Sequence, residues 1–386
     1  MCDRASALQM KPAPTMPMTF TSTSIIHEFT MSPLENRLHY PLSDQLPAPG
    51  NTLEVAPGVF WLRMGLPFAL DHINLWLLRD VRDGVVGWTV VDCGIDNPTT
   101  RQHWQAVLDQ HLQGAPLWRV IVTHMHPDHL GLGHWLCERW QAQLWISFTD
   151  YQAAVLATMH HDSFGGEAAA AFFQQHGLHD EASLDQVRGR STYYAGMVPK
   201  IPSQFHRLQD GHTVVINGLA WQCISGFGHA PEHIALYQAE SGLLISGDMV
   251  LPRISTNVSV YDTEPEADNL RLFLESIDKF KPLPASTLTL PSHGKPFVGL
   301  HERIAQLHAH HQDRLDEVLQ ACTAKACSAH DVLPVLFKRP LDLHQTTFAM
   351  GEAVAHLHCL WHAGQLHRSA DAQGVWRFTS AATHRP

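Results

Sequence analysis

The stretch Thr123-His124-Met125-His126-Pro127-Asp128-His129 places three histidines and one aspartate within six positions. It directly follows the apolar run Val120-Ile121-Val122, so the polar cluster lies at the end of a predicted buried strand. Buried imidazoles and carboxylates need partners, because an unpaired polar group inside a protein costs free energy. They are also the ligands that a divalent ion such as zinc prefers. The stretch therefore predicts half of a metal site.

Three later positions repeat this arrangement of one polar residue after a predicted strand. They are His229 after residues 220–224, Asp248 after residues 243–245 and His293 after residues 287–290. Ligands at strand ends are held by a rigid sheet, as a metal site requires. The complete predicted ligand set is His124, His126, Asp128, His129, His229, Asp248 and His293.

Seven side chains supply enough nitrogen and oxygen atoms for two metal ions. One ion is expected on the three histidines His124, His126 and His229. The second is expected on Asp128, His129 and His293. Asp248 is expected to bridge them. Two adjacent divalent ions share a hydroxide that is nucleophilic at neutral pH, and they polarise the substrate oxygen.

Composition bounds the class of protein. The chain has 386 residues, of which 45% are hydrophobic and 16% are charged, as expected of a globular protein with one large and one small domain. No apolar run approaches the ~18 residues of a membrane span, and no secretory signal is expected. The seven cysteines are odd in number and form no CxxC pair, which predicts free thiols in the cytoplasm. The net charge of −11 opposes loose binding to nucleic acid.

The chain divides into three predicted parts. Residues 1–50 show no period and predict a flexible extension. Residues 51–300 form the predicted catalytic domain, because strands alternate with helices in an α/β layer and two hairpins follow, one with an Asn217-Gly218 turn. Within this domain, the Ala-rich residues from about 150 to 205 predict a helical insertion beside the site, with no strand until after Arg207.

Residues 301–386 predict a small C-terminal domain of the winged-helix type. Three helices are expected near 301–321, 331–337 and 350–363, followed by two short strands. This tail holds eight basic and eight acidic residues, whereas a DNA-reading domain is normally clearly basic. A packing, substrate-framing or oligomerising role is therefore favoured.

The ordered motifs resemble the metallo-β-lactamase-fold hydrolase superfamily. His124, His126, Asp128 and His129 match its HxHxDH signature, and His229, Asp248 and His293 match its later single ligands in the same order. The resemblance spans about residues 53–300 and implies a four-layer αββα sandwich. It also implies that Asp92, in Val90-Val91-Asp92-Cys93-Gly94, orients the site residues. Capping of the helix near Asn97 is the alternative for Asp92.

The resemblance narrows the chemistry further. With a bridging aspartate at position 248, the chain is similar to the glyoxalase-II-like, lactonase-like and RNase-like branches. True β-lactamases of this fold mostly carry Cys or Ser near that position. The tail resembles the winged-helix appendage of the β-lactamase-like protein 2 group, in which some members are associated with RNA cleavage. Related discrete enzymes are thioesterases that act on acyl carriers.

The predicted function is binuclear metal-dependent hydrolysis of an ester, thioester or lactone in a small acyl substrate. Zinc is the favoured metal, with iron or manganese as alternatives. Asp128, Asp248 and Asp92 are the predicted catalytic residues. Asp248 is expected to relay a proton to the leaving group. A homo-oligomer remains an open alternative for the assembly.

Competing interpretations remain at this point. An endoribonuclease or phosphodiesterase would need a basic groove, drawn from Arg188, Arg190, Lys200, Arg207 and Arg253. A β-lactamase is less favoured, as is a non-enzymatic DNA-binding protein, because structural zinc sites are closed and four-coordinate. Lactonase-like relatives support the oxyanion with a tyrosine. For Tyr193 and Tyr194, however, a packed aromatic is favoured, and His233 is expected to be structural.

Overall fold

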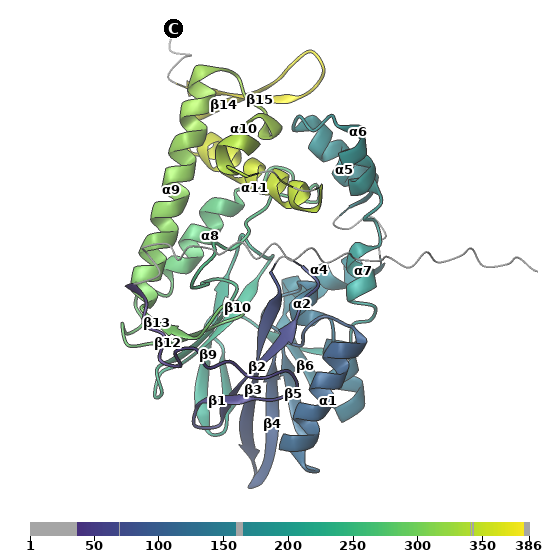
Figure 1. Ribbon diagram of the computed structural model, residues 1–386, viewed down its shortest axis with the longest axis vertical. Coiled ribbons are helices and arrows are strands. Elements are labelled where there is room, and N and C mark those ends of the chain that lie inside the picture. Colours follow the sequence, from purple (N-terminus) through teal and green to yellow (C-terminus); the bar gives the residue numbers. More distant parts are fainter. Residues whose placement is uncertain (1–36, 69, 160–164, 340, 342, 382–386) are drawn as a thin grey trace, which may run out of the picture.

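Two β-sheets lie face to face in the lower half of the view, and helices cover their outer sides (Figure 1). The computed structural model describes residues 37–381 except 69, 160–164, 340 and 342. The αββα sandwich expected from the sequence is confirmed. A second, helical layer lies above it in the view of Figure 1.

The first sheet has seven strands in chain order, antiparallel from β1 to β4 and parallel from β4 to β7. Its strands are β1 (Leu53–Ala56), β2 (Val59–Gly65), β3 (His72–Arg82), β4 (Val85–Val91), β5 (Leu117–Ile121), β6 (Gln143–Ser147) and β7 (Phe205–Leu208). Because β4 and β5 are parallel, their carboxyl ends meet at one edge. Asp92 and the 123–129 stretch both emerge at this edge.

The second sheet has six strands in the order β13-β12-β11-β10-β9-β8. They are β8 (Thr213–Ile216), β9 (Leu219–Gly226), β10 (His233–Gln238), β11 (Leu243–Gly247), β12 (Leu288–Pro291) and β13 (Phe297–Val298). Both predicted hairpins are present, and Asn217 and Gly218 take the positive φ values that their turn requires.

Large apolar side chains fill the space between the sheets. Trp61, Trp76, Ile234, Ile245 and Leu290 are fully buried there and belong to one cluster. Each side chain of this size contributes about 1.5–3 kcal/mol when it leaves water. This packing gives the loops at the sheet edges a rigid base.

The outer helices begin where the sequence predicts. In α1 (Pro98–Leu112), the Asn97 side chain accepts a hydrogen bond from Thr100 N at 2.8 Å, and Pro98 occupies the first turn. The other helices on the first sheet are α2 (Pro127–Leu130), α3 (Gly133–Trp140) and α4 (Phe148–Met159), and α8 (Asn269–Asp278) covers the second.

The insertion is helical, with one correction. It contains α5 (Gly166–Gln175), α6 (Glu181–Arg188) and α7 (Tyr193–Met197) after α4. The prediction of no strand before Arg207 is wrong, because β7 begins at Phe205 and pairs parallel with β6. This edge strand is short, and two of its four side chains are exposed, so it carries little apolar pattern.

The tail has the predicted order of three helices and two strands. They are α9 (Leu300–Ala324), α10 (Ala329–Leu336), α11 (Leu343–His362), β14 (Leu366–Ala370) and β15 (Trp376–Ser380). Helix α9 runs from the base of the second sheet to β15, while α11 faces α6 of the insertion (Figure 1). The winged-helix assignment remains a prediction. None of the helices within the described residues is long and apolar enough to cross a membrane.

Residues 37–50 fall inside the predicted flexible extension, and their first residues contact the second sheet whereas Gly50 lies against α1. Leu38 is buried, and His39 forms a β-bridge with Val298. The rest of the predicted extension, residues 1–36, lies outside the described residues.

Candidate metal centre

The seven predicted ligands meet at one edge of the sandwich. His124 and His126 lie in the loop after β5, and Asp128 and His129 lie on the short helix α2. The other three come from the second sheet, at the loop after β9, the end of β11 and the end of β12; they are His229, Asp248 and His293.

Their ligand atoms form three overlapping groups, and within each group all atoms lie within 4.8 Å of one another. The groups are His124–His126–His229, His124–His129–Asp248 and Asp128–His129–His293. The first and third coincide with the two predicted ligand sets. The second contains one histidine of each set, together with Asp248.

Asp248 lies between the two sets. Its Oδ2 is 3.3 Å from His229 Nε2, and its Oδ1 is 3.6 Å from His129 Nε2 and 3.5 Å from His293 Nε2. One carboxylate therefore faces a ligand of the first set and two ligands of the second. This is the geometry that a bridging aspartate needs.

Two buried atoms test whether these residues fit a metal ion. His129 Nε2 and Asp248 Oδ1 have no hydrogen-bond partner among the described residues, and both side chains are less than 10% exposed. At 3.6 Å they are too far apart to bond one another. A cation between them would satisfy both atoms, so the donor set fits divalent metal.

The pKa shifts of the histidines differ between the two ligand sets. Burial and the neighbouring imidazoles lower the pKa values of His124 and His126 well below the usual range, which keeps them neutral and able to bind metal. Burial opposes protonation of His129 and His293 as well, but carboxylates raise the pKa of both. Asp248 contributes to both increases.

Asp92 supports the 123–129 stretch directly. Its carboxylate accepts hydrogen bonds from Thr123 N at 2.8 Å and from His129 Nδ1 at 2.8 Å. A φ of 62°, unusual for a residue other than glycine, accompanies this orientation. Asn97 caps α1, so the capping alternative for Asp92 is wrong. Asp92 is fully buried and does not line the cavity described below, so it acts through His129.

Asp150 and Tyr194 support the same stretch, and sequence reasoning assigned neither this role. Asp150 accepts hydrogen bonds from Met125 N at 2.7 Å and from Glu232 N at 2.6 Å, and thereby ties the 123–129 stretch to the loop after His229. Burial raises the pKa of Asp150 to about 6. Tyr194 donates from its hydroxyl to Met125 O at 2.6 Å, so this tyrosine is engaged in packing, as favoured.

His293 and Asp248 have their own supports. His293 Nδ1 donates to His72 O at 2.7 Å, and Gly294 N donates to His72 Nε2 at 2.9 Å. Asp248 N donates to His233 Nε2 at 3.2 Å, which gives His233 the structural role expected of it. A Cβ on Gly247 would clash with the same nitrogen, so only glycine fits there.

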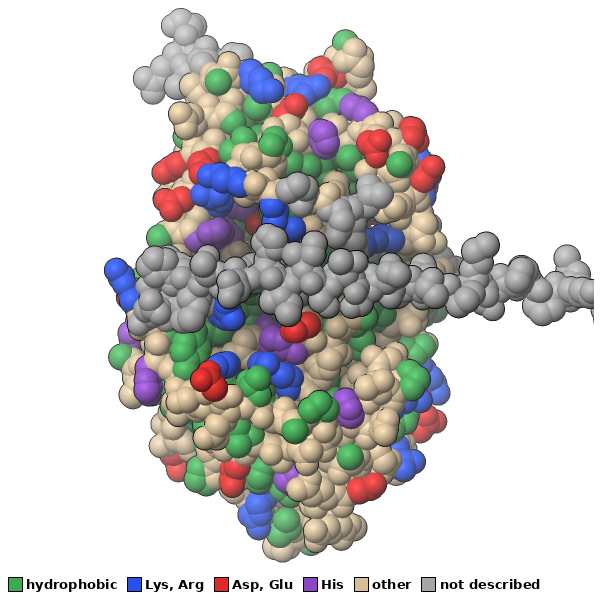
Figure 2. Space-filling model, in the orientation of Figure 1, with side chains coloured by type: hydrophobic (Ala, Val, Ile, Leu, Met, Phe, Trp, Pro, Cys, Tyr) green, Lys and Arg blue, Asp and Glu red, His purple; other side chains and the backbone are tan. Residues whose placement is uncertain are grey.

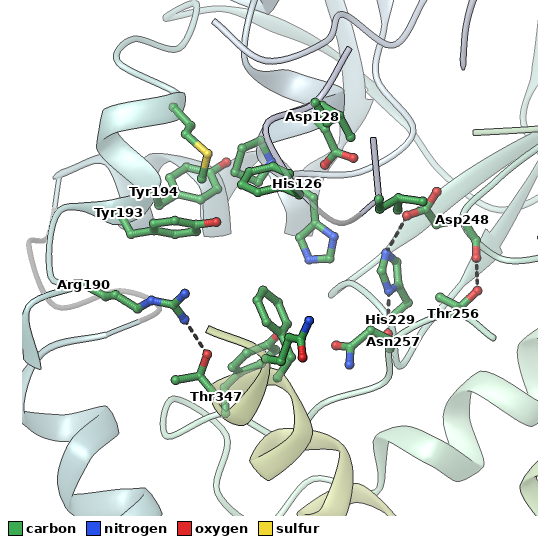
Figure 3. Close-up of a pocket in the computed structure, with 18 of the residues that line it drawn as sticks. His126, Asp128, Arg190, Tyr193, Tyr194, His229, Asp248, Thr256, Asn257 and Thr347 are labelled. Carbon is green, nitrogen blue, oxygen red and sulfur yellow. Dashed lines mark hydrogen bonds and ion pairs between the residues drawn. The ribbon is translucent and has the colours of Figure 1, made fainter. Parts of the chain in front are cut away.

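His229 is supported through the segment of residues 256–260. His229 Nδ1 donates to Asn257 O at 2.7 Å, and Thr256 donates from its hydroxyl to Asp248 O (Figure 3). The Asn257 side chain in turn donates from Nδ2 to Glu352 Oε2 of α11 at 3.3 Å. Burial raises the pKa of Glu352 to about 7.

Helix α11 lies directly on this segment. Val260 N donates to Gly351 O at 3.1 Å, and a Cβ at Gly351 would lie 2.7 Å from the Ser259 side chain. No larger residue fits at position 351 without movement of the helix or of the segment. The C-terminal domain therefore contacts the second layer of residues around His229, a link that no local sequence pattern indicates.

A cavity of about 840 Å³ opens beside the ligands. Asp128, His126, His229, Asp248 and His293 form its polar edge. Its other walls come from the β2–β3 loop, the insertion, the 251–262 segment and the start of α11, and they are mostly apolar. Figure 3 shows side chains from the insertion and from α11 facing the ligands across this space.

The face of the molecule in Figure 2 shows histidine, acidic and basic side chains near the waist, between the sandwich and the C-terminal helices. Lysines and arginines on this face alternate with acidic residues and form no continuous stripe.

Comparison with known proteins agrees with the fold. A family model described as "Metallo-beta-lactamase superfamily" matches residues 70–330. A second, described as "Metallo-beta-lactamase-like, C-terminal domain", matches residues 315–381. The chain belongs to the metallo-beta-lactamase superfamily.

Three relatives show how far the similarity extends. A crystal structure of a beta-lactamase domain protein from Burkholderia ambifaria is 52% identical, covers 91% of this chain and 100% of its own, and has a TM-score of 0.86. A metallo-beta-lactamase family protein from Thermus thermophilus is 27% identical over 85% of this chain and 100% of its own, with a TM-score of 0.68. "Probable metallo-hydrolase YqjP" of Bacillus subtilis (strain 168) is 24% identical over 78% of this chain and 92% of its own.

Proposed function

We propose that the protein is a hydrolase that uses two divalent cations, with zinc favoured, to cleave an ester, thioester or lactone of a small acyl compound. The observation that carries the proposal is the ligand cluster at the polar edge of an otherwise apolar cavity. Superfamily membership and the name of the Bacillus subtilis relative support hydrolysis.

The proposal assigns each side chain a role. His124, His126 and His229 would hold one ion, Asp128, His129 and His293 would hold the other, and Asp248 would serve both. When bound, such ions lower the pKa of water and polarise a carbonyl oxygen.

The chain itself orients the substrate, excludes water and moves the proton. Burial favours the protonated form of Asp248, but His293 and His129 hold its pKa well below the usual range. Its carboxylate lines the cavity, where we assign it the orientation of the leaving group or the relay of a proton to it. Asp92 and Asp150 keep the ligands in place, and the apolar walls bind the acyl group.

The cavity favours an acyl compound over a polynucleotide. Of the five basic residues named for a nuclease groove, Arg190 lines the cavity and the other four do not. Arg188 instead pairs with Glu167, Glu181 and Asp185 on the surface. Cleavage of a phosphodiester or of RNA stays the alternative, and β-lactam hydrolysis and non-enzymatic DNA binding are less favoured.

The tail is proposed to frame the substrate, because Gln345, Thr347 and Phe348 line the cavity. A winged-helix form, membership of the β-lactamase-like protein 2 group and a cytoplasmic location belong to the same proposal.

Metal analysis joined to a substrate panel tests the function. Protein prepared with excess zinc should hold about two ions per chain, and it should cleave a thioester, lactone or aryl ester faster than a phosphodiester, RNA or a β-lactam. Asp128→Asn should abolish most turnover with little change in Tm. Absence of bound metal, or preference for the phosphodiester, would contradict the proposal.

A further inference from the structure

Arg190 extends into the cavity from the segment between α6 and α7. Among the described residues that line the cavity, it is the one lysine or arginine. Figure 3 shows its guanidinium entering from the side opposite His229 and Asp248. Arg190 and the proposed metal ligands therefore face one another across the cavity.

The contacts that hold Arg190 include three with described residues. Its Nη1 donates a hydrogen bond to Thr347 Oγ1 in the first turns of α11, and its Cζ lies 5.1 Å from the centre of the Tyr193 ring. Its backbone packs against Gly165, where a Cβ would come within 2.6 Å of the Arg190 Cβ. The insertion and the tail thus position the guanidinium together, as expected of a preorganised binding group.

The surroundings favour an anionic ligand at this point. A guanidinium stays protonated at any pH a protein tolerates, and its planar donors match a carboxylate or phosphate. Charge interactions strengthen where apolar walls exclude water, and the walls here include Phe173, Val187 and Phe348. Asp262 also lines the cavity, so a ligand with a cationic group is the opposite expectation.

We propose that the substrate carries an anionic group that binds Arg190 while its carbonyl lies at the ligand cluster. This inference rests on the proposed function and specifies its substrate. A carboxylate at the far end of the acyl chain is the favoured source, because the walls beside Arg190 suit hydrocarbon. A phosphate on the leaving group, on the other side of the carbonyl, could pair with Arg190 in the same way and is the alternative source.

The test uses full-length, zinc-loaded protein and p-nitrophenyl esters of one chain length that end in a methyl, a carboxylate or an ammonium group. A fourth compound is a neutral acyl thioester with a phosphate on its leaving group, compared with its phosphate-free counterpart. The carboxylate ester should show kcat/KM about tenfold or more above the methyl ester, mainly through KM, as one charge-assisted pair provides.

Variants assign the preference to its source. Arg190→Gln should remove the preference for carboxylate, and Arg190→Lys should restore part of it, because the charge returns without the planar donors. Arg188→Gln is the matched control, since Arg188 lies two residues away and outside the cavity lining. The preference of Arg188→Gln for the carboxylate ester should equal that of the unmodified protein. Tm values of all three variants show whether each one folds.

A binding measurement with compounds that cannot be hydrolysed distinguishes failure of this inference from failure of the proposed function. Methyl ketones that correspond to the three esters cannot be hydrolysed, and calorimetry should show the carboxylate ketone binding about tenfold tighter, again lost in Arg190→Gln. Equal binding of the carboxylate and methyl ketones would overturn the inference even if esters are cleaved, and so would preference for the ammonium compound. Selective binding without turnover of any carbonyl substrate would uphold the anion site and contradict the hydrolase. A preference confined to the phosphate-bearing thioester would support the anion site and assign it to the leaving group.

Discussion

The two halves of the ligand cluster are supported in different ways. The 123–129 stretch is held by Asp92, Asp150 and Tyr194, all of which belong to the sandwich and its insertion. His229 and Asp248 contact the 256–260 segment, on which helix α11 of the C-terminal domain rests. The comparison shows that one half depends on the catalytic domain alone, whereas the other depends also on the tail.

The largest effect should come from the half that the sandwich supports. Asp92→Asn removes the charge that faces His129 Nδ1, and loss of such a partner typically weakens metal affinity by about 10–100-fold. Competition with a chromogenic chelator measures it. Asp109→Asn, on the exposed side of α1, is the control and should leave the affinity unchanged. An unaltered affinity in Asp92→Asn would show that Asp92 does not orient the ligand.

A second prediction concerns the contact that joins the halves. Asp150→Ala leaves the Met125 and Glu232 amides without their acceptor, so the free energy of unfolding of metal-free protein should fall by about 2–3 kcal/mol. Urea unfolding measures it. Asp150→Asn keeps one carbonyl oxygen, so its free energy of unfolding should lie between those of the unmodified protein and Asp150→Ala. Equal stability of Ala and Asp at this position would mean that the two loops are held elsewhere.

A smaller effect should come from the tail. Glu352→Ala removes the acceptor for Asn257 Nδ2, so one of two ions should bind up to about tenfold more weakly while the other is unchanged. Glu352→Gln retains an acceptor and should recover most of the affinity. Asp331→Asn weakens the cap of α10 but does not touch the 256–260 segment, and it should alter stability alone. Equal weakening of both ions in Glu352→Ala would refute the proposed division of support.

The last prediction is a pH dependence of stability. The pKa of Glu352 is about 7 in the folded protein, against an ordinary value of 4.5. Between these values the folded chain holds a proton that the unfolded chain has released, so stability falls as pH rises through this window. In Glu352→Gln this contribution is absent. Urea unfolding of metal-free protein at pH 5 and pH 7 should therefore show a steeper decline for the unmodified chain, and parallel declines would contradict the raised pKa.

The sandwich and the ligand set could be predicted from sequence because their signals are local. Each ligand lies within a few residues of the end of an apolar strand, and His124, His126, Asp128 and His129 share one short motif. Such strand ends must meet when the strands share an edge. The Asn97 cap and the Asn217-Gly218 turn were equally local, and both were correct.

The supports could not be predicted, because their partners are distant and often backbone atoms. Asp150 accepts from amides 25 and 82 positions away, and Glu352 lies 95 positions from Asn257. A single buried carboxylate leaves no periodic trace in the sequence. The edge strand β7 was missed for a related reason: it is short and half exposed, so neighbouring strands determine it more than its own residues.

The contact between Gly351 and the 256–260 segment has a consequence for how the protein matures. A chain leaves the ribosome from its N-terminus, so Asp92, the histidine motif and Asp150 are available long before α11. During synthesis the sandwich can gather its first ligands while the support beneath His229 is still missing. Metal loading should therefore proceed in order, with one position able to retain its ion early and the other only after the last long helix has docked.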